Sequence, residues 1–200
     1  MRNMHQFATD SLERRNITAS IAILTIPLAF IINELPRQLG YSIPWWFDYP
    51  SVLGLFFLMY EIFNKSLWKW EVFKAFGLVK VPDLNGKWNG TLNTSYDGYK
   101  LNRTVTASIT QSWTEMIMYL ETNQSRSYTL TSAILVNQPN GITLSYEYFD
   151  EPITTAPETM HSHRGSGILK LNVNNLELKG EYYTGRDRMT NGSIFLRRCT

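Results

Sequence analysis

From residue 84 to residue 200, apolar and polar side chains alternate with a period of two, and turn signals interrupt the alternation at near-regular spacing. This pattern indicates strands with one buried face, and tight turns between sequential strands favour an up-and-down antiparallel meander. Closure of such a sheet removes its exposed edges. We therefore predict an all-β, antiparallel, eight-stranded up-and-down barrel over residues 84–200, with strands near 86–95, 100–112, 115–122, 126–136, 142–150, 161–173, 176–184 and 191–198.

The amino-terminal third has a different pattern, with two long apolar stretches. Ile17–Ile32 carries no charge, and at about 1.5 Å per residue it nearly spans a hydrocarbon layer of roughly 30 Å. The second stretch has Trp and Tyr near both ends, which is typical of transmembrane helices. We therefore predict a membrane α-helical hairpin in residues 1–63, with transmembrane helices at about 17–35 and 45–63. A cleaved signal peptide is the alternative, but no small-residue cleavage site follows Ile32.

Basic residues flank the predicted hairpin on one side of the membrane. They precede the first helix and follow the second, whereas Arg37 is the only basic residue in the link between the helices. The positive-inside rule therefore predicts that both termini lie in the cytoplasm. Residues 64–83 interleave aromatic side chains with lysines and are predicted to form an interfacial helix and linker. Packing of this segment against the following domain is the alternative.

The predicted strand phases bring polar side chains together at one rim of the barrel. In a meander, the odd-numbered strands end where the even-numbered strands begin. Guanidinium groups bind phosphate bidentately, and tyrosine faces stack on bases, so this rim predicts a site for an anionic, aromatic ligand. His161 or His163 shares the rim and the inward phase. The predicted ligand-binding residues are Arg103, Arg126, Tyr128, Tyr146, Tyr148, Tyr182, Thr184, Arg186 and Arg188.

Composition and motifs argue against several other functions. The net charge is +2 without a long basic run, so neither DNA nor RNA polymers are expected as partners. The chain contains no nucleophile–base spacing, P-loop or dinucleotide fingerprint, so we predict no enzymatic activity and no cofactor. His161 and His163 share a strand face but lack a third ligand in phase, so no metal site is predicted. Glu147 and Asp150 are expected to be surface carboxylates.

Three stretches of the barrel carry a family resemblance. Leu84–Leu92 reads LNGKWNGTL, and its Gly-Trp-Gly pattern occurs in many lipocalin-like barrels. The others are Gly165-x-Gly167-x-Leu169-x-Leu171 and Leu178-x-Gly180-x-Tyr182-x-Thr184-Gly185-Arg186, the latter leading into Gly192-x-Ile194-x-Leu196. With the preceding helical hairpin, the whole chain resembles the two-transmembrane β-barrel effectors of bacterial CBASS antiphage defence, the SMODS-associated membrane effectors.

This resemblance implies a function. The barrel would be a cytoplasmic receptor for a cyclic dinucleotide made by a companion nucleotidyltransferase. Binding would drive homo-oligomerisation, and the assembled helices would disrupt the cell inner membrane and kill the infected cell. Two alternatives remain open at this point: a membrane-tethered, lipocalin-like carrier of a fatty acid or other amphiphile, and a structural or enzymatic subunit of a membrane complex.

Overall fold

The computed structural model describes residues 4–40, 52–156, 160–174, 176–186 and 188–199. The chain divides into two compact units. One unit combines Met1–Ser11 with Val81–Thr200, and the other is Leu12–Lys80.

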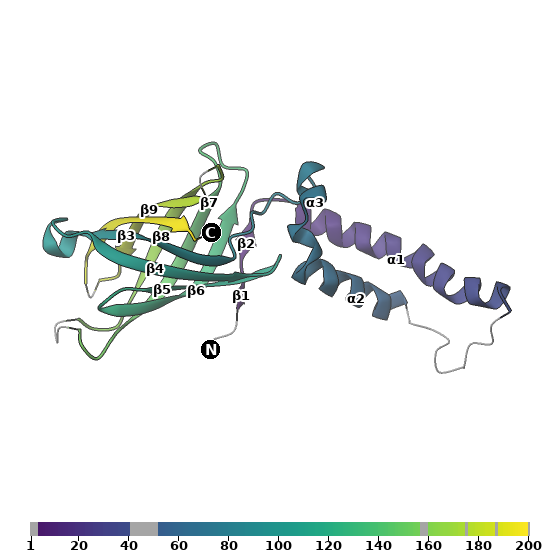
Figure 1. Cartoon of the computed structure of the whole chain (residues 1–200), viewed down its shortest axis with the longest axis horizontal. Helices are drawn as coiled ribbons and strands as arrows, with labels where there is room; N and C mark the ends of the chain where they lie inside the picture. The colour runs from purple at the N-terminus through teal and green to yellow at the C-terminus, as the bar shows by residue number, and fades with distance from the viewer. Residues whose placement is uncertain (1–3, 41–51, 157–159, 175, 187, 200) are drawn as a thin grey trace. The chain divides into compact units, whose positions relative to one another are not determined.

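The first unit is a closed antiparallel barrel (Figure 1). Each of the eight barrel strands, β3 to β10, pairs with the next along the chain, and β10 pairs with β3. The predicted eight-stranded up-and-down barrel is therefore confirmed. Its strands are β3 (Gly86–Thr94), β4 (Arg103–Gln111), β5 (Glu115–Glu121), β6 (Ser125–Leu135), β7 (Thr143–Pro152), β8 (His163–Asn172), β9 (Glu177–Thr184) and β10 (Asn191–Arg198).

Two short strands that the sequence did not predict complete the wall. β5 and β6 share three residue pairs, at the end nearest their connecting turn. Farther along, β1 (His5–Gln6) pairs antiparallel with β5, and β2 (Ala8–Thr9) pairs parallel with β6. Between these strands, Phe7 is 2% exposed. The segment that precedes the helical unit therefore fills the seam where β5 and β6 separate.

A β-bulge in β6 reverses the direction of its side chains. The register against β7 shifts between Thr129 and Thr131. Beyond the bulge, the even-numbered Ile134 points inward as predicted and is fully buried. Before it, Tyr128 lies opposite Tyr119 and Phe149, with ring centroids 6.5 and 5.8 Å away. These partners belong to the outer faces of β5 and β7, so the predicted inward direction of Tyr128 is wrong.

Large apolar side chains fill the closed end of the barrel, which is the end where β3 begins. Trp88 is fully buried, and its indole N–H donates a hydrogen bond to the carbonyl of Leu84 at 3.0 Å. Burial of each large aliphatic side chain at this end contributes about 1.5–3 kcal/mol to stability. Other side chains below 2% exposure include Trp113, Met116, Ile134, Leu144, Leu169, Leu178 and Leu196.

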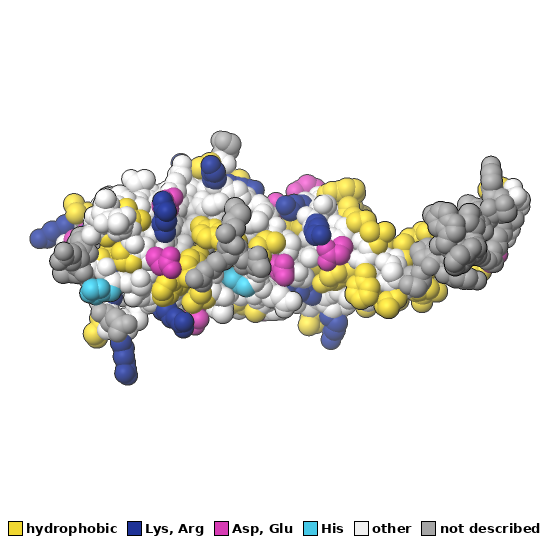
Figure 2. All heavy atoms as spheres, turned by 90° about the horizontal axis from the view of Figure 1, so that it is seen from below, with side chains coloured by type: hydrophobic (Ala, Val, Ile, Leu, Met, Phe, Trp, Pro, Cys, Tyr) yellow, Lys and Arg dark blue, Asp and Glu magenta, His cyan; other side chains and the backbone are white. Residues whose placement is uncertain are grey.

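The second unit is helical. It contains α1 (Glu13–Gln38), α2 (Val52–Lys65), the 3-10 turn η1 (Leu67–Lys69) and α3 (Glu71–Ala75). Within α1, the hydroxyl of Thr25 donates to the carbonyl of Ile21 at 2.7 Å, and it lies 3.7 Å from the sulfur of Met59 on α2. Large hydrophobic side chains on both helices are exposed, and many are visible in Figure 2.

One predicted membrane span agrees with the structure, and the other is not confirmed. Glu13–Ile32, with 20 residues, is long and apolar enough to cross a membrane. The described part of the second predicted span, residues 52–63, lies within the 14-residue helix α2, while residues 45–51 of that span lie outside the described residues. Within the predicted interfacial helix and linker of residues 64–83, α3 has five residues and the chain turns at Gly77, whose φ is +67°.

Candidate ligand-binding site

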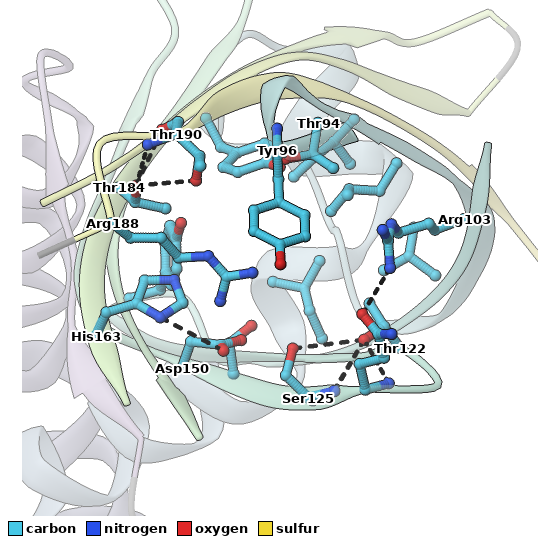
Figure 3. Close-up of a pocket in the computed structure, with 18 of the residues that line it drawn as sticks. Thr94, Tyr96, Arg103, Thr122, Ser125, Asp150, His163, Thr184, Arg188 and Thr190 are labelled. Carbon is cyan, nitrogen blue, oxygen red and sulfur yellow. Dashed lines mark hydrogen bonds and ion pairs between the residues drawn. The ribbon is translucent and has the colours of Figure 1, made fainter. Parts of the chain in front are cut away.

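The mouth of the barrel, opposite the closed end, contains a pocket lined by residues from all eight barrel strands. Its empty volume is about 740 Å³, including space open to solvent. Figure 3 looks into this pocket. The predicted site residues that line it are Arg103, Tyr146, Tyr148, Tyr182, Thr184 and Arg188.

Each of three pocket tyrosines lies across a glycine on the neighbouring strand. Tyr146 is in register with Gly167 of β8, and Tyr148 with Gly165. A Cβ atom at either glycine would lie 2.4 Å from the tyrosine ring, and the same crowding occurs between Tyr182 and Gly192 of β10. Glycine is therefore needed at these positions so that the rings can lie against the pocket wall.

Burial keeps the tyrosine hydroxyls protonated. It is the main cause that raises the pKa of Tyr146, and the nearby Tyr182 acts in the same direction. Burial likewise raises the pKa of Tyr148 and of Tyr182. The hydroxyl oxygen of Tyr146 is buried and has no hydrogen-bond partner among the described residues. This hydroxyl can therefore donate to a ligand.

Arg188 projects into the pocket from the β9–β10 hairpin (Figure 3). Hydrogen bonds between Thr184 and Thr190 help to close the hairpin: the Thr184 amide donates to the Thr190 carbonyl at 2.9 Å, and the Thr190 amide donates to Oγ1 of Thr184 at 2.8 Å. The guanidinium carbon of Arg188 lies 5.4 Å from the ring centroid of Tyr96. Its Nη1 is buried without a hydrogen-bond partner in the described part of the chain.

Arg103 occupies another part of the wall and is held more firmly. Its Nη1 donates to Oε1 of Gln124 at 2.6 Å, and its Nη2 donates to Oδ2 of Asp97 at 3.2 Å. Its Nε is buried and has no partner among the described residues. The two guanidinium groups of the pocket therefore differ, because Arg103 forms an ion pair with Asp97 and Arg188 forms none with the residues that the structure describes.

A buried carboxylate also lines the pocket. Asp150 is 6% exposed, and burial raises its pKa, although the hydroxyl of Ser125 and the charges of His163 and Arg188 act in the opposite direction. Oδ2 of Asp150 lies 3.8 Å from Nδ1 of His163, which donates to the carbonyl of His161 at 3.1 Å. The expectation of a surface carboxylate is therefore wrong for Asp150.

Three predicted residues lie outside the pocket. Arg126 precedes the bulge and points outward, where its Nε forms an ion pair with Glu121 at 2.8 Å and its side chain is 71% exposed. Tyr128 is on the same outer face. Arg186 is exposed and is absent from the lining. The predicted inward direction of Arg126 and Arg186 is wrong.

Sequence reasoning missed several lining residues. The bulge turns Ser125 and Ser127 inward, and Tyr96 belongs to η2 (Ser95–Asp97), which follows β3. Neither feature shows in a period-two pattern. For Asp150 a signal was present, because it continues the inward series of Leu144, Tyr146 and Tyr148. The pocket residues that were not predicted include Thr94, Tyr96, Gln124, Ser125, Ser127, Asp150 and Met160.

The fold and the pocket together define a class of protein, a small closed β-barrel with a polar, aromatic pocket at one mouth. Residues 79–198 match the family described as Cap15, cyclic dinucleotide receptor domain. Because this match covers more than half of the chain, the protein belongs to that family of CBASS effectors, and the resemblance seen in the sequence is confirmed. A comparison with curated proteins finds no match.

Proposed function

We propose that the mouth of the barrel holds the cyclic dinucleotide, with Arg188 and Arg103 at its phosphates and the tyrosines against its bases. The observation that carries this proposal is the convergence on one pocket of three donors that have no partner among the described residues: Nη1 of Arg188, Nε of Arg103 and the hydroxyl of Tyr146. A buried donor without a partner costs about 1–3 kcal/mol. Phosphate oxygens would satisfy such donors, and guanidinium groups bind them strongly.

The closed end of the barrel argues against the amphiphile carrier. An acyl chain would need an apolar channel below the polar mouth. That region is occupied instead by side chains with almost no exposed area, such as Trp88, Leu178 and Leu196. The available space is at the mouth, where polar and aromatic groups gather.

The proposed response takes place in the membrane. We propose that α1 and the second apolar segment both span the bacterial inner membrane, with both termini in the cytoplasm. Ligand binding favours assembly of several copies, whose helices then disrupt the membrane without any enzymatic step. A ligand can do this only if it binds the assembled form more tightly, and about 1.4 kcal/mol of difference shifts the equilibrium tenfold. The exposed hydrophobic side chains of α1 and α2 support this proposal.

Calorimetry on the full chain in detergent, with a panel of cyclic dinucleotides, tests the ligand site. Arg188→Ala should weaken binding by about 1.5–3 kcal/mol, the scale of a hydrogen bond to a charged group. Arg186→Ala is the matched control, because it removes an exposed arginine from the same hairpin. Arg126→Ala is the second control, and both should bind like the wild type. Equal losses in all three variants would place the site elsewhere, and no binding by the wild type would overturn the proposal.

Dye release from vesicles tests the membrane response. The full chain reconstituted in lipid vesicles should release dye when the ligand is added, and the Arg188→Ala protein should need a higher ligand concentration. Light scattering on the same samples reports assembly. Ligand binding without either dye release or growth in size would contradict the proposed mechanism.

A further inference from the structure

A buried carboxylate is unexpected in a pocket for a dianionic ligand. Asp150 lines the same pocket as Arg103 and Arg188, and its side chain is 9% exposed. A carboxylate repels phosphate, and a buried one is costly unless it is paired. Its presence at the mouth therefore needs an explanation other than phosphate binding.

The surroundings of Asp150 leave one of its oxygens available. Its Oδ2 atom is buried and has no hydrogen-bond partner in the described part of the chain. The structure pairs Oδ2 with Nδ1 of His163, at 3.8 Å, which is beyond hydrogen-bond distance. In Figure 3, the Asp150 carboxylate lies between His163 and Ser125, and the Arg188 side chain extends toward it.

An ionised carboxylate can only accept hydrogen bonds. Among the four common bases, guanine alone presents two adjacent donors on its pairing edge, the ring N1–H and the exocyclic amino group. Adenine and cytosine each place an acceptor beside their amino group, and uracil places its N–H between two carbonyl oxygens. A carboxylate at this position therefore fits guanine and meets at least one repelling acceptor on each other base.

We infer that Asp150 reads the pairing edge of a guanine base and selects guanine-containing cyclic dinucleotides. This inference rests on the proposed function, because it assumes that the pocket at the mouth is the ligand site. Asp150 is then the specificity-determining residue of the pocket, while Arg188 and Arg103 supply binding energy that does not depend on the base.

Calorimetry with four cyclic dinucleotides tests the inference on the full chain in detergent. The probes are cyclic di-GMP, cyclic GMP–AMP, cyclic di-AMP and cyclic di-UMP. The wild type should bind the two guanine-containing probes about tenfold or more tightly than the other two, because a good base contact gives roughly that discrimination. Asp150→Asn keeps the shape but presents an amide that can donate. It should lose about tenfold in affinity for the guanine probes and change little toward cyclic di-AMP.

Glu147→Gln is the matched control, because Glu147 is an exposed carboxylate on the opposite face of β7. It should leave all four affinities unchanged. If Asp150 only positioned Arg188, Asp150→Asn would weaken all four probes by the same factor, and the inference would be overturned while the proposed function stood. A wild type that prefers cyclic di-AMP or cyclic di-UMP would also overturn it. A wild type that binds no probe would overturn both.

Discussion

The two ends of the barrel interior are built from the same strands and differ sharply in chemistry. β7 shows the change within one face, where Leu144 at the closed end gives way to Tyr146, Tyr148 and then Asp150 at the mouth, all at most 7% exposed. At the closed end, the polar group of Trp88 is paired with a carbonyl. At the mouth, buried polar atoms of Tyr146, Asp150 and Arg188 have no partner among the described residues.

The difference shows how one continuous sheet separates stability from binding. The closed end is packed as an ordinary core, so its substitutions should lower the stability of the fold. The mouth keeps polar groups that no described residue satisfies, which is typical of functional sites that sacrifice stability for activity. Substitutions that change only the stability of the fold or only ligand binding support this division. Substitutions that change both properties contradict it.

The largest expected effect is at the closed end. Trp88→Ala removes a fully buried ring and its hydrogen bond, and should lower the free energy of unfolding by about 3–5 kcal/mol. Urea denaturation of the full chain in detergent, followed by circular dichroism of the β-sheet, measures this change. Arg126→Ala, an exposed residue on the outer face, should stay within about 0.5 kcal/mol of the wild type. A loss below about 1 kcal/mol for Trp88→Ala would show that this end is not the main core.

A smaller effect is expected from a substitution at the mouth that should lower both the stability of the fold and the affinity for the ligand. Gly167→Ala places a Cβ atom 2.4 Å from the Tyr146 ring, so the ring must move into the pocket. Overpacking of this kind costs about 1–3 kcal/mol of stability, and the displaced ring should also weaken ligand binding. Ser166→Ala, on the exposed face of the same strand, is the control and should change neither property. Unchanged binding by Gly167→Ala would mean that the Tyr146 ring does not contact the ligand.

The smallest effect is expected to be a gain in stability at the mouth. Asp150→Asn should raise the free energy of unfolding at neutral pH by about 0.5–2 kcal/mol, because it removes a buried charge. Burial raises the folded-state pKa of Asp150 above its ordinary value of 3.8, so ionising Asp150 costs more in the folded than in the unfolded protein. The wild type therefore loses stability as the pH rises through that raised pKa, and the advantage of Asp150→Asn should grow over the same range. Denaturation curves between pH 4 and 8 measure it, and a less stable variant would contradict the prediction.

The order of the barrel strands and the location of the rim could be predicted from the sequence, because period-two alternation and turn residues are local signals. The bulge could not, since neither Gly nor Pro marks Thr129–Thr131. It reversed the side chains that precede it and moved Arg126 and Tyr128 outside. The period-two pattern placed Asp150 on the inward face of its strand, but a charged residue is usually exposed, so it was predicted to lie on the surface. β1 and β2 are two residues long, and their pairing depends on a seam more than a hundred residues away.

Those two short strands change how the molecule can be divided. The family match begins at residue 79, yet the barrel wall also uses His5–Thr9, which come before the helices in the chain. In topology, the helical unit is thus an insertion within the barrel, with one covalent connection on each side of it. A transplanted barrel would need this segment restored as a separate peptide, and such a peptide added in trans would provide a split-protein version of the receptor.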